Sequence, residues 1–240
     1  MVVFYIFFVL ETTRIYIADI SVLKETSVFE RLLSRVPEYR QKKVMSFKFE
    51  KGKMQSLGVG LLLQMACNEV GLAHADERIA YGENGKPFFA NFPEVHFNLS
   101  HSGERVMCVI SPFNVGCDVE IIKGDRGRLA ERFFKPEESL WIKHFETLEA
   151  QSDAFYRLWT LKECYMKVTG RGMSLMPDKF ALHVDENENI SLYHDGERQE
   201  YSFREIDLYD GYRYAYCVKT DGKNAPQEVK FVDLAQKSSS

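Results

Sequence analysis

One stretch decides how this chain folds: Phe155-Tyr-Arg-Leu-Trp-Thr-Leu-Lys-Glu-Cys-Tyr-Met-Lys-Val168. At about 100° per residue, its apolar side chains cover nearly the whole circumference of a helix, which predicts a core helix rather than a surface helix. Lys162, Glu163 and Lys167 interrupt this apolar surface. Because burying a charge without a partner is costly, these groups imply either internal pairing, such as Glu163 with Lys167, or a charged ligand.

A similar helix occurs once before in the chain. Pro37 and Pro136 are 99 residues apart, and the same offset separates Gly71 from Gly170, which each follow a long apolar helix in the expected cap position. This recurrence predicts two similar halves, although any two segments of helix and strand share a few such matches. The predicted helices cover 27–34, a segment that starts at Pro37, about 53–70, about 128–150, and 152 or 153 to 168.

Strand signals occupy much of the rest of the chain. Alternation of apolar and polar residues predicts a half-buried strand at 95–99, and two apolar runs, 105–111 and 115–122, predict a hairpin about Pro112. We also expect strands in 1–10, in 15–20 and through most of 179–232. The predicted fold class is therefore α+β, with one half in 1–112, a second half in 113–233 and a tail in 234–240.

Two acidic residues lie on the second strand of that hairpin, Val115-Gly-Cys-Asp-Val-Glu-Ile-Ile122. Asp118 and Glu120 are two residues apart, so their side chains point to the same face of a strand. Like charges repel on a buried strand, and a cation relieves the repulsion; carboxylate oxygens favour Mg²⁺. Glu163 would supply a third oxygen. The alternative is an edge strand whose acidic face meets solvent, where the pattern has no special meaning.

Basic and hydroxyl groups offer contacts for an anion. Gly85-Lys-Pro87 and Asn98-Leu-Ser-His-Ser-Gly103 place a lysine, serine hydroxyls and a histidine in expected loops, where they can reach phosphate oxygens. A basic segment before the first long helix predicts either a local anion site or a solvated helix face. It has seven cations within 19 residues: Arg35, Arg40, Lys42, Lys43, Lys48, Lys51 and Lys53.

The composition limits the classes of function. The 240 residues include 31 Lys and Arg against 35 Asp and Glu, a net charge of −4, which argues against a dedicated nucleic-acid-binding protein. The five cysteines form no C-x-x-C pair, which indicates a reducing compartment. The apolar opening, 1–10, lacks a positive n-region and a cleavage site and is too short to span a membrane. We therefore expect a cytoplasmic protein that binds neither nucleic acid nor membrane.

In the types and the order of its motifs, the chain resembles the Sfp-type 4′-phosphopantetheinyl transferases over about residues 37 to 220. The Gly-x-Asp-x-Glu and Trp-x-x-Lys-Glu-x-x-x-Lys elements together are specific to that family, whose members are pseudo-dimers of two α+β halves with the active site in the cleft between them. The matching segments are Gly85-Lys-Pro-Phe88, Phe97-Asn-Leu-Ser-His-Ser-Gly103, Val115-Gly-Cys-Asp-Val-Glu120, Arg132-Phe-Phe134 with Glu138, and Leu158-Trp-Thr-Leu-Lys-Glu-Cys-Tyr-Met-Lys167 before Gly170-Arg-Gly172.

The resemblance implies transfer of 4′-phosphopantetheine from coenzyme A to a serine hydroxyl of an apo acyl or peptidyl carrier protein, with release of adenosine 3′,5′-bisphosphate. Asp118, Glu120 and Glu163 match the family's Mg²⁺ ligands, and Glu163 also matches its proposed general base. Lys167 matches a lysine that stabilises the pyrophosphate, so Asp118, Glu163 and Lys167 are the implied catalytic residues. Coenzyme A contacts are implied for Lys167 and for Lys42, Lys86, Ser100, His101 and Lys162.

Two positions qualify what the resemblance implies. Near Gln55 the family often has a threonine, so the resemblance does not extend that coenzyme contact to this chain. Gln64 stands in the first half where Glu163 stands in the second, at the same offset of 99 residues. Only the second half therefore carries the carboxylate, and we expect one site in each chain and a monomeric enzyme.

Two other functions fit parts of the pattern. A Mg²⁺-dependent phosphodiesterase or nuclease uses the same acidic residues and lysines, but the net charge and the loop at 98–103 argue against it. A non-catalytic relative that only binds carrier proteins is disfavoured because all three carboxylates are present.

Overall fold

The computed structural model describes residues 10–219 and 226–235. The first half contains five strands and three α-helices, with two short 3₁₀ helices, and the second half repeats this plan with a larger insertion before its last strands. In the first half these are β1 (Thr13–Asp19), η1 (Ser21–Lys24), α1 (Thr26–Leu33), α2 (Glu38–Met45), α3 (Glu50–Glu69), η2 (Ala75–Glu77), β2 (Ile79–Tyr81), β3 (Pro87–Phe89), β4 (His96–Ser102) and β5 (Arg105–Ser111).

The second half begins with a strand and again continues into three α-helices. Its elements are β6 (Val115–Ile121), α4 (Gly127–Phe133), α5 (Pro136–Lys143), α6 (Leu148–Val168), η3 (Gly172–Ser174), η4 (Pro177–Lys179), β7 (Phe180–Val184), β8 (Ile190–His194), β9 (Glu197–Gln199), β10 (Ser202–Ile206) and β11 (Tyr212–Val218). A final strand, β12 (Gln227–Val232), follows.

The strand order confirms the prediction of two similar α+β halves. One sheet has the order β12-β1-β5-β4 and the other has the order β10-β11-β6, so β1, β5 and β4 correspond to β6, β11 and β10. The shared strands are antiparallel in both sheets. The glycines at the predicted offset also correspond, because Gly71 and Gly170 follow α3 and α6 with φ of 74° and 68°. Two copies of one α+β unit therefore build the molecule.

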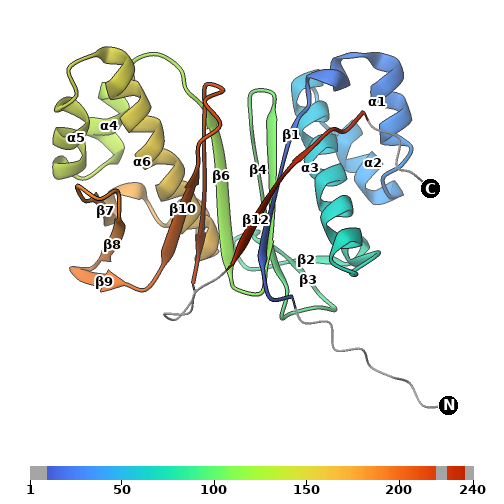
Figure 1. Cartoon of the computed structure of the whole chain (residues 1–240). Coiled ribbons are helices and arrows are strands. Elements are labelled where there is room, and N and C mark those ends of the chain that lie inside the picture. Colours follow the sequence, from blue (N-terminus) through green and yellow to red (C-terminus); the bar gives the residue numbers. More distant parts are fainter. Residues whose placement is uncertain (1–9, 220–225, 236–240) are drawn as a thin grey trace.

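The two sheets face each other in the middle of the molecule, and the helices cover their outer faces (Figure 1). Helices α1 to α3 lie on one side and α4 to α6 on the other. Each half buries its own apolar core between helices and sheet. A third apolar cluster joins the sheets, with Ile15, Ile17 and Val109 from the first half and Val119 and Tyr216 from the second. Burial of these faces holds the halves together.

A glycine lets α6 approach β6 closely. A Cβ atom at Gly116 would collide with the backbone oxygen of Cys164 and the backbone nitrogen of Val168. Only glycine fits at this crossing, because it has no Cβ. The close approach places the polar side chains of α6 directly over the acidic residues of β6.

The structure corrects two predicted elements. The hairpin at 105–122 is wrong, because β5 pairs with β1 and β4 whereas β6 pairs with β11 in the facing sheet. The helix at 128–150 is also wrong as a single helix. Pro136 starts the separate helix α5, and α6 begins at Leu148, where the hydroxyl of Thr147 accepts a hydrogen bond from Ala150 N.

The end of the chain departs from the predicted boundaries. Strand β12 belongs by sequence to 113–233, yet it pairs in parallel with β1 in the sheet of the first half. Leu234 is buried in the core of the first half, so the segment expected as a tail starts inside the folded chain. Residues 1–9 of the expected first strand and 236–240 of the expected tail lie outside the described residues.

Candidate active site

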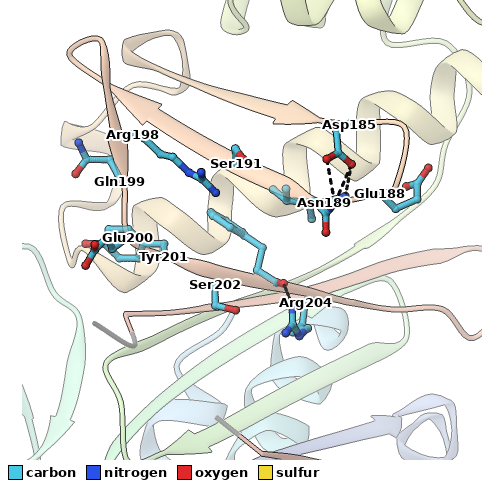
Figure 2. A pocket seen from close by; sticks show the side chains of 12 residues that line it. Asp185, Glu188, Asn189, Ser191, Arg198, Gln199, Glu200, Tyr201, Ser202 and Arg204 are labelled. Carbon is cyan, nitrogen blue, oxygen red and sulfur yellow. Dashed lines mark hydrogen bonds between the residues drawn. The ribbon is translucent and has the colours of Figure 1, made fainter. Parts of the chain in front are cut away.

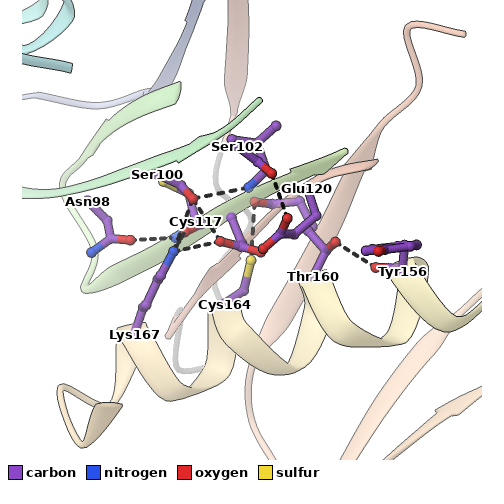
Figure 3. Close-up of polar contacts among 12 residues, drawn as sticks. Asn98, Ser100, Ser102, Cys117, Glu120, Tyr156, Thr160, Cys164 and Lys167 are labelled. Atoms are coloured by element: carbon purple, nitrogen blue, oxygen red, sulfur yellow. Dashed lines mark hydrogen bonds and ion pairs between the residues drawn. The ribbon is translucent and has the colours of Figure 1, made fainter. Parts of the chain in front are cut away.

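Hydrogen bonds from the backbone of β6 to side chains of β4, rather than bonds between the two backbones, join β4 to β6. Each strand lies at the edge of its own sheet, so the backbone N–H groups on the outer side of β6 need acceptors from elsewhere. Alternate residues of β4 supply them (Figure 3). We call these contacts the β4–β6 seam: Cys117 N donates to Asn98 Oδ1 (2.8 Å), Val119 N to Ser100 Oγ (3.2 Å) and Ile121 N to Ser102 Oγ (3.2 Å).

The two serines of the seam also hold the acidic residues of β6. Ser100 Oγ donates to Asp118 Oδ1 at 2.7 Å, and Ser102 Oγ donates to Glu120 Oε2 at 2.6 Å. Asp118 is buried and Glu120 is half-buried. Each serine therefore accepts from the backbone of β6 and donates to the carboxylate of the preceding residue on that strand. The seam fixes both carboxylates relative to the first half.

Lys167 reaches the same point from α6. Its Nζ donates to Asp118 Oδ1 at 2.6 Å, to Cys117 O at 3.0 Å and to Ser100 Oγ at 3.1 Å, so three acceptors meet its three N–H bonds. Burial alone would lower the pKa of Lys167, but the carboxylate of Asp118 outweighs burial and raises it. The ammonium is therefore charged, and 26% of its side chain remains exposed.

Glu163 lies one helical turn before Lys167, near both acidic residues of β6. Burial, followed by the negative charge of Asp118, raises the pKa of Glu163 to about 7. Burial also raises the pKa of Glu120, and the charge of Asp118 adds to the rise. Among residues 10–219 and 226–235, no hydrogen-bond or ion-pair partner meets the Glu163 carboxylate. With a pKa of about 7, the Glu163 carboxyl group gains or loses its proton near neutral pH.

The three carboxylates suit a divalent cation in their chemistry. Carboxylate oxygens are the ligands that Mg²⁺ prefers, and mutual repulsion among Asp118, Glu120 and Glu163 is the strain that a cation relieves. Asp118 Oδ2 is buried and has no hydrogen-bond partner in the described part of the chain, so one oxygen is available. The described residues contain no group of three or more His, Cys, Asp or Glu side chains already arranged to hold a metal ion.

Lys162, an implied coenzyme contact, lies elsewhere. Its side chain is 0% exposed, and its Nζ pairs with Glu138 Oε1 at 2.8 Å. The same nitrogen donates to Pro177 O at 2.8 Å and to Phe180 O at 2.9 Å. Because every N–H bond of this buried ammonium has a protein acceptor, Lys162 belongs to the core of the second half.

Lys86, another implied coenzyme contact, joins the two halves. Its Nζ donates to Asn114 Oδ1 at 2.6 Å, to Val115 O at 3.0 Å and to Val168 O at 3.1 Å. All three acceptors belong to the second half: Asn114 precedes β6, Val115 starts β6 and Val168 ends α6. Burial lowers the pKa of Lys86 to about 8. This lysine is a clasp between the halves, and a ligand would have to compete with three protein oxygens for its ammonium.

The remaining implied contacts are on the surface or in the seam. The expected loop at 98–103 is wrong, because Asn98 to Ser102 lie on β4. Ser100 is a seam residue, and His101 follows it with an exposed side chain. Lys42 is exposed on α2 and pairs with Glu38 at 2.7 Å. The basic segment around it is not a uniform cationic surface, because Arg40 is buried against α3 at Gly60.

Two cavities lie at different places relative to these groups. A cavity of about 350 Å³ lies where the halves meet, beside the Lys86 clasp. A larger cavity of about 860 Å³ lies between the β7-β8-β9 sheet and β10, and none of the sequence-predicted site residues lines it (Figure 2). The smaller cavity is lined by Gly82, Lys86, Pro87, Phe88, His96, Phe97, Asn114 and Gly170.

Sequence reasoning missed Asn98 and Ser102 as site residues. Both lie in the quoted segment Phe97-Asn-Leu-Ser-His-Ser-Gly103, and the signal was available there. Polar residues at 98, 100 and 102 alternate with 97, 99 and 101, so a strand turns them to one face. What the sequence does not reveal is that this face meets the edge of β6.

Family models match both halves of the chain. The model described as the 4′-phosphopantetheinyl transferase superfamily matches residues 114–217, which include the acidic residues of β6 and the whole of α6. The model described as the N-terminal region of 4′-phosphopantetheinyl transferase matches residues 24–112. The border between the two matches falls in the link from β5 to β6, close to the expected border between the halves.

Curated relatives match across most of the chain. The 4′-phosphopantetheinyl transferase Sfp of Bacillus subtilis strain 168 is 31% identical over 208 residues, which cover 86% of this chain and 92% of that protein. The 4′-phosphopantetheinyl transferase gsp of Aneurinibacillus migulanus is 32% identical over 192 residues, 79% of each chain. Another Bacillus subtilis 4′-phosphopantetheinyl transferase is 30% identical over 79% of this chain and 84% of its own length. This chain belongs to the Sfp-type 4′-phosphopantetheinyl transferases.

Proposed function

We propose that this chain transfers the 4′-phosphopantetheine group of coenzyme A to a serine hydroxyl of an apo acyl or peptidyl carrier protein, in the cytoplasm and as a monomer. One observation carries the proposal: Asp118, Glu120, Glu163 and Lys167 converge from β6 and α6, beside a buried oxygen of Asp118 that has no partner in the described chain. Membership of the transferase family gives the reaction class.

In the proposed reaction, the carrier serine oxygen attacks the β-phosphorus of coenzyme A. A bond forms between these atoms, the bond from the β-phosphorus to the bridging oxygen breaks, and adenosine 3′,5′-bisphosphate leaves. Glu163 takes the serine proton, directly or through a water molecule, because its carboxylate has no competing donor among the described residues. Lys167 holds a positive charge next to the pyrophosphate, where negative charge develops.

A divalent cation completes this proposal. Asp118, Glu120 and Glu163 would hold Mg²⁺, which when bound would neutralise charge on the pyrophosphate. The unpartnered oxygen of Asp118 supports this assignment. Gln64 stands in the first half where Glu163 stands in the second, which supports one site per chain.

The coenzyme is expected at the junction of the halves. The cavity of about 350 Å³ lies there, with the stem of Lys86 and the ring of Phe88 in its wall. We propose that the nucleotide end binds near this cavity and near His101, and that Lys42 contributes an outer charge. Lys162 takes no part in this proposal, because its buried ammonium already pairs with Glu138.

Intact-mass measurement of an apo carrier protein tests the proposal. The carrier is incubated with the enzyme, coenzyme A and Mg²⁺, and we expect it to gain the mass of one phosphopantetheine. Glu163→Gln is expected to abolish the gain, whereas Glu149→Gln, at an exposed position in the first turn of the same helix, retains it. Absence of any gain with a panel of apo carriers, or cleavage of DNA or RNA without binding of coenzyme A, would overturn the assignment.

A further inference from the structure

The outermost contact of the β4–β6 seam joins the two halves at an acidic residue. Ser102 Oγ accepts from Ile121 N at 3.2 Å and donates to Glu120 Oε2 at 2.6 Å. A serine hydroxyl has one hydrogen to donate, so the donor of Ser102 is committed to Glu120. Ser102 belongs to the first half and Glu120 to the second, and this contact therefore links the position of a carboxylate to the docking of the halves.

Glu120 depends on the Ser102 donor more than Asp118 depends on either of its two donors. Asp118 receives hydrogen bonds from both Ser100 and Lys167. In the described residues, Ser102 is the only hydrogen-bond donor to the carboxylate of Glu120, and no ion pair replaces it. Removal of the Ser102 hydroxyl would leave Glu120 free to rotate, whereas Asp118 would keep a donor if Ser100 were lost.

The turn that follows Ser102, at Gly103 and Glu104, is held by both halves. Gln55 Nε2, from α3, donates to Gly103 O at 3.0 Å. Tyr212 Oη, from β11, accepts from Glu104 N at 3.1 Å. Gly103 has φ of 55° and packs so closely on Tyr212 that a Cβ atom would collide with the Tyr212 hydroxyl. The backbone beside Ser102 is therefore fixed before any ligand binds.

We propose that Ser102 is a positioning residue that aims the Glu120 carboxylate at the cation site, so that the first half orients a ligand belonging to the second. This inference rests on the proposed function, because it assumes that Glu120 binds the divalent cation. Hydrogen-bond partners of ligating carboxylates fix the direction of the ligand, and their loss typically weakens metal affinity by about 10–100-fold.

Binding of Mn²⁺ to the full chain tests the inference without turnover. Free Mn²⁺ is titrated and measured by electron paramagnetic resonance. Ser102→Ala is expected to weaken Mn²⁺ binding by about tenfold or more. Ser102→Thr keeps the hydroxyl and is expected to bind Mn²⁺ as the wild type does. Ser102→Cys retains a side chain of similar size with a weaker donor, and an intermediate affinity is expected.

Ser111→Ala is the matched control. Ser111 is a buried serine that, like Ser102, has two contacts, since its Oγ bonds to Thr13 Oγ1 at 2.8 Å and accepts from Phe113 N at 3.1 Å, but it lies outside the seam. We expect its Mn²⁺ affinity to equal that of the wild type.

Kinetics separate failure of this inference from failure of the proposed function. With coenzyme A and an apo carrier, Ser102→Ala is expected to raise the Mg²⁺ concentration needed for half-maximal rate, with a smaller change in the rate at saturating Mg²⁺. A folded Ser102→Ala or Ser102→Cys protein that binds Mn²⁺ as tightly as the wild type would overturn the role of Ser102 while transfer continues. Loss of transfer and of Mn²⁺ binding in the wild type would overturn the proposed function itself.

Discussion

Two lysines of α6, five residues apart, form ion pairs of opposite character. Lys162 Nζ lies 2.8 Å from Glu138, and Lys167 Nζ lies 2.6 Å from Asp118. Lys162 is fully buried in the core of the second half, and its carboxylate partner also accepts from Lys135 N and Leu182 N. Lys167 is partly exposed at the junction of the halves. We call the first pair closed, because both oxygens of Glu138 accept from protein donors, and the second open, because one oxygen of Asp118 has no partner in the described chain.

The difference shows what makes a charged pair available for chemistry. Glu138 uses both oxygens on protein donors, so the Lys162 pair has no free capacity. Asp118 keeps one buried oxygen without a partner in the described chain, and two more carboxylates lie nearby. A closed pair stabilises the fold around it only while both partners remain. An open pair leaves unmet hydrogen-bonding capacity, which a ligand can satisfy.

The largest effect is expected when the closed pair loses one partner. Glu138→Ala leaves Lys162 charged and buried without its carboxylate, which costs about 3–5 kcal/mol of unfolding free energy. Urea denaturation measures the loss. The double variant Glu138→Leu with Lys162→Met removes both charges and is expected to recover most of the stability. A loss below about 1 kcal/mol in the single variant would show that this pair is not closed.

The open pair is expected to respond in activity rather than in stability. Asp118→Ala removes one of three repelling carboxylates and leaves Lys167, whose side chain is partly exposed, its contacts with Ser100 and Cys117, so we expect a smaller loss of unfolding free energy than in Glu138→Ala. Transfer to an apo carrier is expected to fall by about 10²–10³-fold, or roughly 2.7–4 kcal/mol of transition-state stabilisation.

Asp153→Ala is the control for Asp118→Ala. Asp153 Oδ1 accepts from Arg213 Nε at 2.8 Å in the second half and takes no part in the seam. We expect its transfer rate to equal that of the wild type. Near-normal transfer by Asp118→Ala would contradict the distinction between the open and the closed pair.

Sequence patterns located the two halves because local signals repeat. Pro37 and Pro136 stand at the starts of corresponding helices, and Gly71 and Gly170 follow corresponding long helices with positive φ. These features depend on backbone geometry within a few residues, which the sequence encodes directly. The fold class could therefore be predicted. The link at Pro112 could not, because apolar strands joined by a short turn fit a hairpin as well as two facing sheets.

The candidate site could be predicted only in part, for a similar reason. Helical spacing marked Lys162 and Lys167 as charges on a core helix but did not reveal their partners. Glu138 and Asp118 belong to other elements, and only tertiary packing decides which lysine meets which carboxylate. Ser102 was missed because its partner on β6 depends on how the edges of two sheets meet.

A smaller effect on stability is expected at the Lys86 clasp, whose ammonium has three oxygen acceptors but no carboxylate partner. Lys86→Met removes three hydrogen bonds between the halves, which Asn114, Val115 and Val168 of the second half accept. We expect unfolding free energy to fall by about 1–3 kcal/mol, measured in urea at pH 7. Lys86→Arg keeps the charge and serves as its comparison. No change in Lys86→Met would mean that the clasp does not hold the halves.

The clasp also predicts a pH dependence with a defined sign. Burial lowers the pKa of Lys86 to about 8 in the folded protein, against an ordinary value of 10.5. Between these values the unfolded chain binds more protons at Lys86 than the folded chain, so this lysine makes the unfolding free energy rise with pH in that window. Because other groups also titrate there, the measured quantity is the difference between wild type and Lys86→Met. We expect that difference to grow in favour of the wild type from pH 8 to pH 10.5. A difference that shrinks would mean that the three oxygen acceptors outweigh burial and raise the pKa of Lys86 in the folded state. Lys86 would then resemble Lys167, whose pKa is raised by its carboxylate partner.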